Sequence, residues 1–290
     1  MEDVTIVMPA FNEVKFIGKA IGSAIHQAQR VIVCDNDSTD GTKDIYPQFL
    51  KYKNFQLIQQ PKNMGSVASA KLLFSSVETK YVAVMGAHDI LSDNYIATLH
   101  HCLENNPDVV LAYAPANRID EDDAIFDQYF MEDIADGVAS DDVFERVLTI
   151  IKHLNDCTVV YCLARAEEFL KCLDYTPVAA GDHCVLCELV THGKFMRCDE
   201  ARFSRRYLNR EETNEAYMKR IQGDSSPNNY QRDLTYMIKR QLEILQSVPC
   251  DDESKKASYI AQAKQALIER FDDIERFKID YAAVVNSVTE

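Results

Sequence analysis

The chain has 290 residues and a formal charge of −15, because 46 Asp and Glu outnumber 31 Lys and Arg. Hydrophobic residues make up 47% and charged residues 27%, a balance typical of globular proteins that excludes collagen-like and disordered chains. A surface this acidic repels phosphate backbones, so we expect no nucleic-acid partner. Any phosphate ligand then needs a local source of positive charge, such as a metal ion, a helix N-terminus or a small Arg cluster.

We expect neither a leader nor a membrane span, since the first residues are acidic and no stretch reaches about 18 uninterrupted apolar residues. A cytoplasmic protein is the expectation. The nine cysteines, an odd number, suit a reducing compartment. Cys184 and Cys187 share one face of an expected helix, and no second pair follows at zinc-site spacing. Their expected role is therefore core packing.

Short apolar runs and helical patterns alternate through the first 120 residues. The expected strands cover 4–8, 30–34, 55–59, 81–85 and 109–114, and the expected helices cover 15–27, 66–76 and 92–105, with another beginning near 38–40. Strands separated by such helices need right-handed crossovers, which predicts a mainly parallel α/β sheet with helices on both faces. Ligands of such sheets bind at the carboxyl ends of the strands.

The chain changes character at residues 120–142, which are rich in acids and weakly periodic. They are expected to form either a linker between two halves or a solvated acidic surface loop. Two helical stretches, roughly 230–246 and 254–281, close the chain. Their apolar residues are expected either to pack on the domain or to form a homo-oligomer contact. The weakly acidic segment 219–241 is the candidate for peripheral membrane contact. Between linker and closing helices, we expect helices at 143–154, 166–173 and 182–192 and strands at 158–163 and 194–198.

Polar side chains follow three of the expected strands. Residues 9–13 (PAFNE) follow the first strand, 35–42 (DNDSTDGT) the second and 86–89 (GAHD) the fourth. Asn, Asp, Ser and Gly are ordinary turn and N-cap residues, which explains part of this pattern. Carboxylates at the end of one strand after another are more typical of a binding site.

Several segments resemble, in the same order, the family 2 glycosyltransferases of the GT-A fold, a Rossmann-like, mostly parallel sheet flanked by helices. The matching segments are VTIVMPAFNEVKFIGKAIGSAI (4–25), VIVCDNDSTDGT (31–42), KNMGSVASAK (62–71), YVAVMGAHDILSDNYIATL (81–99), CLARAEEF (162–169) and GDHCVLCELVTHGKF (181–195). The resemblance spans residues 4–207. It implies an inverting enzyme that moves a sugar from a nucleotide-sugar donor, expected to be a UDP-sugar, to a glycan or lipid-linked acceptor. Bacterial surface-polysaccharide synthesis is the implied setting.

The resemblance also implies how the chain is divided. Residues 1–119 would form the nucleotide-sugar-binding half and 120–210 the acceptor-binding and catalytic half of the same GT-A domain. Residues 211–290 would form a C-terminal helical extension outside the resemblance.

Donor contacts are implied in most of these segments. Asp35 would accept a hydrogen bond from the N3–H group of a uracil ring, and Glu13 would meet the base or ribose. Asp37 would be a turn former or a second nucleoside contact. Lys71 stands where the family usually has Arg, which keeps the charge but loses the bidentate fork. The full set of implied donor-binding residues is Pro9, Ala10, Asn12, Glu13, Asp35, Asp37, Asn63, Gly65, Lys71, Ala87, His88, Arg205 and Arg206.

The family's Asp-x-Asp-Asp pattern is thinned here, because Gly86 and His88 replace two of its three acids. In the family these carboxylates touch the ribose and hold a divalent ion that bridges the two phosphates. The resemblance therefore implies a divalent cation, Mn²⁺ or Mg²⁺, bound by Asp89 with help from His88, and an imidazole ligand favours Mn²⁺. The alternative for His88 is a hydrogen bond without a metal. Arg205 and Arg206 would add charge near the diphosphate, or pair with surface acids.

Asp182 matches the position of the family's catalytic carboxylate, at the start of an expected helix. A carboxylate at a helix start is also an ordinary N-cap. Gly181 stands where many relatives have a second acid, so Asp182 would act alone as the general base that deprotonates the acceptor hydroxyl. His183 and His153 are weaker alternatives.

Two other functions stay open. A nucleotidyltransferase could use a similar sheet, although the first strand-to-helix turn holds PAFNE and not a glycine-rich basic phosphate loop. The thinned metal motif could also mark a sugar-nucleotide-binding or scaffold protein without turnover.

Overall fold

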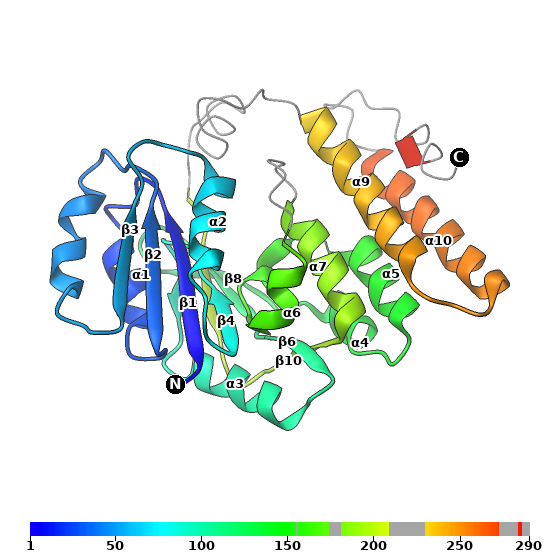
Figure 1. Ribbon diagram of the computed structural model, residues 1–290, viewed down its shortest axis with the longest axis horizontal. Coiled ribbons are helices and arrows are strands. Elements are labelled where there is room, and N and C mark those ends of the chain that lie inside the picture. Colours follow the sequence, from blue (N-terminus) through cyan, green and yellow to red (C-terminus); the bar gives the residue numbers. More distant parts are fainter. Residues whose placement is uncertain (155, 174–180, 209–229, 273–283, 286–290) are drawn as a thin grey trace.

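The computed structural model describes residues 1–154, 156–173, 181–208, 230–272 and 284–285 (Figure 1). It confirms the α/β prediction, because a seven-stranded, mainly parallel sheet is flanked by helices. The strand order of this sheet is β10-β6-β9-β4-β1-β2-β3. Its strands are β1 (Val4–Ala10), β2 (Arg30–Asp35), β3 (Phe55–Gln59), β4 (Tyr81–Val84), β6 (Val109–Tyr113), β9 (Leu163–Arg165) and β10 (Lys194–Arg197).

Strand β1 lies inside the sheet because its apolar run is buried on both faces. It pairs in parallel with β2 and β4, and Ala10 lies opposite Asp35 at the carboxyl end. Successive side chains of a strand point to opposite faces, so Ile6 and Met8 enter one hydrophobic core and Val7 enters the other. The carboxyl ends of β1, β2 and β4 therefore open on the same edge of the sheet.

Helices close both cores. The core that contains Ile6 is covered by α1 (Ile17–Ala24) and α3 (Tyr95–Asn105). The core that contains Val7 receives buried side chains from helices of the second half and from α2. These helices are α2 (Ser66–Ser75), α4 (Glu132–Val138), α5 (Val143–His153), α6 (Ala166–Lys171) and α7 (Gly181–His192).

Two expected elements differ from the structure. The helix expected after residues 38–40 is a pair of 3-10 turns, η1 (Thr42–Asp44) and η2 (Tyr46–Phe49), in which Pro47 lacks a backbone donor for a longer helix. The strand expected at 158–163 is the 3-10 turn η3 (Cys157–Val160), and β9 begins only at Leu163. The carboxylate of Asp156 accepts from the backbone N–H of Thr158 (2.9 Å) and so caps η3.

The prediction of a linker at residues 120–142 is wrong. These residues complete a hairpin of β7 (Ala116–Ile119) with β8 (Ile125–Tyr129) and then form α4. The carboxylate of Asp120 accepts hydrogen bonds from two backbone N–H groups in the turn and so stabilises it. The hairpin joins β5 (Ile90–Leu91) and β11 (Phe203–Arg206) in a second sheet of order β5-β11-β7-β8.

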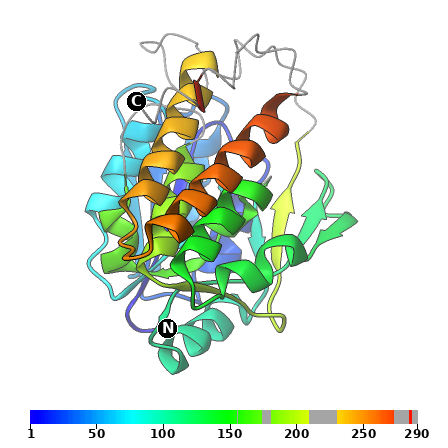
Figure 2. The ribbon, with the colours of Figure 1, turned by 90° about the vertical axis from the view of Figure 1, so that its right-hand side faces the viewer.

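The C-terminal helices α9 (Tyr230–Ser247) and α10 (Glu253–Asp272) pack side by side against α5 and α7 (Figure 2). Leu242 and Leu267 are fully buried there. Arg270 donates to the backbone carbonyl of Ile151 (3.0 Å) and to that of Leu154, at the end of α5. The expectation that these helices pack on the domain is confirmed for the described residues, and the homo-oligomer contact stays a prediction.

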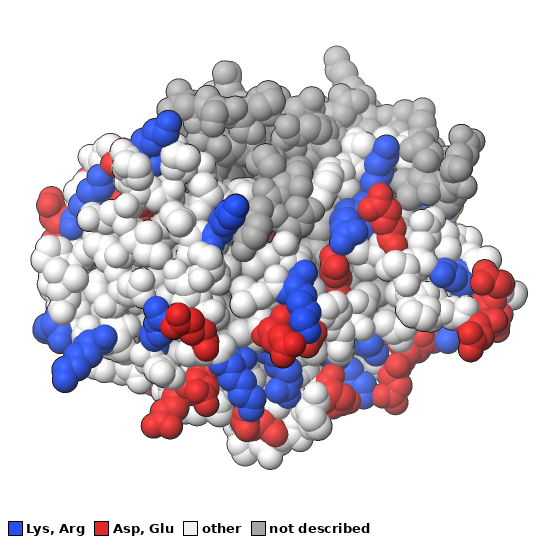
Figure 3. All heavy atoms as spheres, in the orientation of Figure 1, with Lys and Arg blue, Asp and Glu red and all other residues white. Residues whose placement is uncertain are grey.

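The surface mixes both signs of charge. On the face shown in Figure 3, Lys and Arg alternate with Asp and Glu over the described residues and form no broad field of one sign. Among the described helices, none is long and apolar enough to cross a membrane. The candidate membrane-contact segment 219–241 lies outside the described residues as far as position 229.

Candidate active site

A pocket of about 190 Å³ opens at the carboxyl ends of β1 and β4, beside the N-terminus of α2. Its lining consists of Pro9, Ala10, Phe11, Glu13, Asn36, Ser66, Ser69, Gly86, Ala87, His88 and Tyr161. Five of the residues predicted to bind the donor are among them: Pro9, Ala10, Glu13, Ala87 and His88. A larger hollow of about 600 Å³ lies between α3 and the end of β10, but no predicted site residue borders it. We therefore take the smaller pocket as the candidate active site.

The loops after β1 and β2 are fastened to each other below the pocket. Asn12 donates its backbone N–H to the hydroxyl of Ser38 (2.9 Å), and its side-chain oxygen accepts from the backbone N–H of Thr39 (2.8 Å). Asn12 and Asp37 both adopt left-handed backbone conformations, with φ of 57° and 63°, which Asn and Asp tolerate better than most residues. Asp37 also forms an ion pair with Lys43 (2.6 Å). Both residues shape the loops, and neither lines the pocket.

Asp35 lies beneath the pocket and outside its lining. Its side chain is fully buried; one carboxylate oxygen accepts from the hydroxyl of Tyr46 (2.7 Å) and the other from the backbone N–H of Ser38 (2.9 Å). Burial, together with the hydrogen bond to Asp35, raises the pKa of Tyr46, which keeps the phenol protonated as the donor. Both oxygens of Asp35 thus have partners within the protein. The hydrogen bond from a uracil ring to Asp35 stays a prediction.

Asn36 lines the pocket and was missed by the sequence analysis. Its amide donates to the side-chain oxygen of Asn63 (2.8 Å) and accepts from the backbone N–H of Met64 (2.8 Å). The same Asn63 oxygen accepts from the backbone N–H of Gly65 (2.9 Å), which has φ of 84° at the entry to α2. Asn63 and Gly65 thus shape the pocket wall, while Lys71 is exposed on α2 outside the lining.

Glu13 and His88 meet across the pocket from the ends of β1 and β4. A carboxylate oxygen of Glu13 lies 3.1 Å from the Nδ1 atom of His88. Glu13 is nearly buried, whereas the His88 side chain keeps 27% of its surface exposed. The carboxylate orients the ring, so the pocket presents an imidazole at its surface.

The metal-ligand role of Asp89 stays a prediction. Its side chain is fully buried, and one oxygen accepts from the backbone N–H of Arg206 (2.8 Å). The other oxygen has no hydrogen-bond partner among the described residues and packs against Gly86, where an added Cβ would lie only 2.3 Å away. Burial raises the pKa of Asp89, because it disfavours the charged form.

The neighbouring side chains do not complete a carboxylate cage. Enzymes of the GT-A type typically use a divalent cation held by acidic residues, and hard cations require several oxygen ligands. Near Asp89, the described pocket lining contains two side chains that could bind a metal ion, the carboxylate of Glu13 and the imidazole of His88. These two side chains already contact each other. The described residues therefore offer fewer carboxylate ligands than the family pattern, and the divalent cation stays a prediction.

Arg206 holds the second sheet to the pocket floor. Its side chain is fully buried and donates to the backbone carbonyl of His88 (2.8 Å), to that of Asp120 and to the carboxylate of Asp123. The guanidinium also lies 4.6 Å from the ring centre of Phe16. All four of these contacts are within the protein, and the diphosphate contact of Arg206 stays a prediction.

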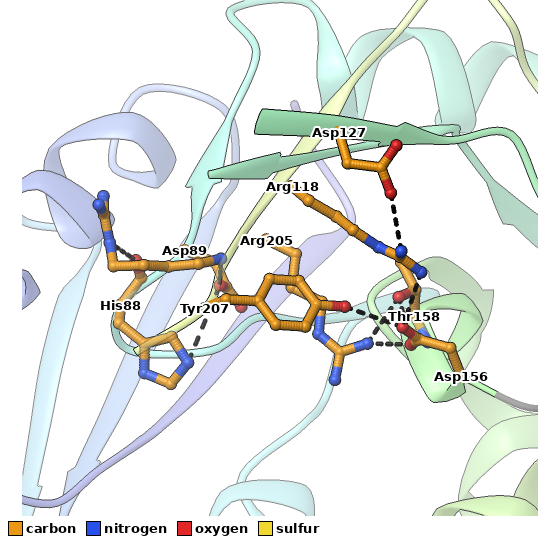
Figure 4. A network of polar contacts seen from close by, with 9 residues as sticks. His88, Asp89, Arg118, Asp127, Asp156, Thr158, Arg205 and Tyr207 are labelled. Atoms are coloured by element: carbon orange, nitrogen blue, oxygen red, sulfur yellow. Dashed lines mark hydrogen bonds and ion pairs between the residues drawn. The ribbon is translucent and has the colours of Figure 1, made fainter. Parts of the chain in front are cut away.

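Arg205 takes part in a polar network next to the pocket (Figure 4). It donates to the carboxylate of Asp156 and to the hydroxyl of Thr158 (2.7 Å). Asp156 also accepts from the hydroxyl of Tyr207 (2.9 Å) and lies 3.4 Å from Arg118. Pairing with an acid, which the sequence analysis kept as the alternative for Arg205, is therefore present. The diphosphate contact stays a prediction.

Asp182 begins α7 and faces η3. One of its oxygens accepts from the backbone N–H of His183 (3.0 Å), and its ligand atoms lie within 4.8 Å of those of Cys157 and His183. Burial, followed by the charge of Asp182, raises the pKa of the Cys157 thiol, and burial lowers the pKa of His183. Asp182 also contributes to the raised pKa of Tyr161, whose main cause is burial, and Tyr161 lines the pocket. The predicted base thus acts electrostatically on a residue of the pocket wall, although it does not line the pocket itself.

Tyr161 and Asp156 are residues of the site that no sequence pattern marks, because their roles depend on partners far away in the chain. Tyr161 stacks on Phe203 of β11 with ring centres 4.8 Å apart, and the ring faces the guanidinium of Arg205 at 5.6 Å. Four further lining residues lie in segments that the sequence marked but were not predicted individually: Phe11, Asn36, Ser66 and Ser69.

The fold defines an α/β protein with a pocket at the carboxyl ends of its parallel strands, and the sequence comparison gives the family. Residues 5–167, more than half of the chain, match the sequence pattern of Glycosyl transferase family 2. The chain therefore belongs to this family.

Individual relatives match part of the chain. It is 28% identical to glycosyltransferase GlyG of Streptococcus pneumoniae over 115 residues, which cover 38% of each chain. It is 27% identical to the uncharacterized glycosyltransferase MJ1057 of Methanocaldococcus jannaschii over 132 residues, which cover 43% of this chain and 46% of that protein. A third relative is the putative teichuronic acid biosynthesis glycosyltransferase TuaG of Bacillus subtilis, 26% identical over 30% of this chain and 36% of that protein. The matches thus span less than half of these relatives.

Solved structures share the fold. Residues 1–349 of S. aureus TarS in complex with UDP-GlcNAc superpose with a TM-score of 0.67, covering 93% of this chain and 73% of that chain at 13% identity. The corresponding complex with UDP gives a TM-score of 0.58 at 12% identity, covering 98% of this chain and 90% of that chain. At this identity the likeness concerns the fold alone.

Proposed function

We propose that this protein is an inverting glycosyltransferase that moves a sugar from a UDP-sugar to a glycan or lipid-linked acceptor. The observation that carries the proposal is the pocket where β1, β2 and β4 end, with Asp182 outside its lining but acting electrostatically on Tyr161 of its wall. Ligands of parallel α/β sheets bind at this edge. Family membership and the UDP and UDP-GlcNAc bound to TarS support a uridine nucleotide as the donor.

The chemistry requires three things of the chain. It must hold the nucleotide, offset the charge of the leaving diphosphate and remove the proton of the acceptor hydroxyl. Glu13 and Asn36 are the polar groups that we assign to the nucleoside. His88, oriented by Glu13, and the positive end of the α2 dipole beside Ser66 are the groups that offset phosphate charge.

In the reaction itself, the acceptor hydroxyl gives its proton to Asp182 while its oxygen bonds to the anomeric carbon. The bond from that carbon to the diphosphate oxygen breaks, and UDP leaves with the electron pair. One carboxylate and one displacement imply inversion of the anomeric configuration. The name of the relative TuaG supports a cell-surface polysaccharide as the setting.

The test is UDP release from a panel of sugar nucleotides, measured with Mn²⁺, with Mg²⁺ and with EDTA. We expect release from at least one UDP-sugar, increased by the acceptor. Because Glu13 is the one acid among the described residues that lines the candidate pocket, and hard cations require several oxygen ligands, we expect donor binding to survive EDTA. Loss of binding on chelation would support the predicted ligand role of Asp89.

The same panel separates the two alternatives. Tight binding of sugar nucleotides without UDP release would favour a binding or scaffold protein. Pyrophosphate formation from a nucleoside triphosphate would favour a nucleotidyltransferase. Either result would contradict the proposed transfer.

A further inference from the structure

Three side chains with different ligand chemistry meet between η3 and α7. The thiol of Cys157, the carboxylate of Asp182 and the imidazole of His183 each offer one ligand atom, and these atoms all lie within 4.8 Å of one another. The family pattern does not involve this combination, since its metal ligands follow β4. The cluster is therefore separate from the Asp89 position discussed above.

Both elements that carry the cluster are held firmly. Helix α7 buries Leu186, Leu189 and Val190 in the core, which fixes the direction of its first turn. Turn η3 is capped by Asp156, which Arg205 in turn holds by an ion pair. Ligands on fixed elements pay little ordering entropy when they bind an ion.

An unpartnered nitrogen gives a second, independent observation. The Nδ1 atom of His183 is buried and has no hydrogen-bond partner among the described residues. A buried ring nitrogen without a partner is costly in a folded protein, and a bound ion is one of the ordinary ways to satisfy it.

The charges around the cluster come from both sides. Asp156 is the nearby acid and is already shared with Arg205 and Arg118. Arg270 of α10 is the nearby cation, but its guanidinium is directed to the backbone carbonyls of Ile151 and Leu154. The ligands themselves bring two negative charges when the thiol is ionised, which matches a divalent ion.

We propose that Cys157, Asp182 and His183 form a binding site for a zinc-class divalent ion, and that the bound ion occupies the carboxylate needed for transfer. Zn²⁺ accepts sulfur, nitrogen and oxygen ligands together, whereas Mg²⁺ and Ca²⁺ require oxygen. Three protein ligands leave a fourth position for water. Binding releases the thiol proton of Cys157 to solvent. The proposed inhibition by the bound ion rests on the proposed function of Asp182 as the base.

The site is tested by titrating the chelator-treated full chain with Co²⁺, which reports a thiolate ligand by a near-ultraviolet charge-transfer band, and by competition with Zn²⁺. We expect one saturable band that one equivalent of Zn²⁺ removes. Cys157→Ser should abolish the band, and His183→Ala should weaken Zn²⁺ binding by about tenfold or more. Cys250→Ser is the matched control, because Cys157 and Cys250 are the two of the nine cysteines that are only partly buried as whole residues.

Several results would overturn the site. It is wrong if the wild-type chain gives no band, if Cys157→Ser keeps it, or if Cys250→Ser removes it. Circular dichroism of each variant shows whether it is folded. His183→Asn provides a second test of that ligand if His183→Ala is unfolded.

Whether the bound ion blocks transfer is tested separately, by zinc inhibition of UDP release. Each variant is compared with its own zinc-free rate of UDP release. One equivalent of Zn²⁺ should inhibit the wild type and Cys250→Ser by about tenfold or more and inhibit Cys157→Ser much less. Zinc binding without inhibition would contradict the blocking role while leaving the site in place. If no donor is turned over at all, the proposed function fails, and the Co²⁺ band still decides the site.

Discussion

Gly86 and Asp89 are coupled by the space between them. A side chain at position 86 would begin 2.3 Å from a carboxylate oxygen of Asp89, so the absence of an acid at 86 permits the inward position of Asp89. The sequence reveals the missing acid, because Gly86 replaces an expected Asp. It cannot reveal the inward position of Asp89, which depends on the backbone N–H of Arg206 far along the chain.

The variant Asp89→Asn tests whether this carboxylate is structural. Burial raises the folded-state pKa of Asp89 above its unfolded value near 3.9. Its contribution to stability is therefore fully present below pH 3.9 and is lost as the pH rises through the folded pKa. Asn keeps the acceptor for Arg206 without a charge. We expect the Tm of the variant minus the Tm of the wild type to increase between pH 4 and pH 8.

The measurement is a pair of melting curves at each pH, with donor binding followed in parallel. A relative Tm that falls with rising pH would contradict the structural role. Donor binding that becomes insensitive to added Mn²⁺ only in the variant would instead support the metal-ligand role.

At the scale of single residues, the sequence predicted the pocket residues that follow strand ends directly. Pro9, Glu13 and His88 were found because apolar strands are easy to delimit and ligands bind at their carboxyl ends. Asn36 and Tyr161 were missed. Neither is charged, and each becomes a wall residue only through tertiary packing.

At the scale of elements, strand β11 connects the two sheets through Arg206. Its buried guanidinium joins the segment after β4 to the β7–β8 turn. Arg206→Ala should lower the free energy of unfolding by about 3–5 kcal/mol, because it leaves buried acceptors without their donor. Lys19 is the matched control, since it pairs with the same Asp123 at the surface.

Chemical denaturation of both variants provides the measurement. Lys19→Ala should cost no more than about 1 kcal/mol, as is usual for an exposed ion pair. Equal losses for the two variants would contradict the account of Arg206 as the link between the sheets.

The elements that the sequence predicted well are those with strong periodicity. Strands β1, β2 and β3 and helices α2, α5 and α7 lie close to their expected bounds. The hairpin at 116–129 was missed because β8 is exposed along its length and carries no buried alternation. Strand β8 forms because it pairs with β7, and β7 in turn pairs with β11, which is distant in the sequence.

At the scale of the whole molecule, the formal charge of −15 makes local neutralisation of a phosphate ligand the central requirement. The candidate pocket offers one histidine and a helix N-terminus for this role, while the buried guanidinium of Arg206 is paired with Asp123. Ligand binding to such a pocket should stabilise the whole fold, because the loops after β1, β2 and β4 all contribute to it.

UDP should therefore raise the melting temperature. At about 100 times its Kd, a ligand that binds only the folded state adds about 2.7 kcal/mol, which corresponds to a Tm increase of several degrees. Differential scanning fluorimetry with UDP measures this, and inorganic phosphate at the same concentration is the control. Equal increases with both ligands would mean that the pocket does not recognise the nucleoside.

The most direct test of the proposed transferase is the variant Asp182→Asn, assayed for donor binding by calorimetry and for sugar transfer by UDP release. Asn has nearly the same shape but cannot accept the acceptor's proton. We predict unchanged UDP-sugar affinity and a loss of transfer of about 10²-fold or more. Transfer at a near-normal rate with intact donor binding would contradict the assignment of Asp182 as the base.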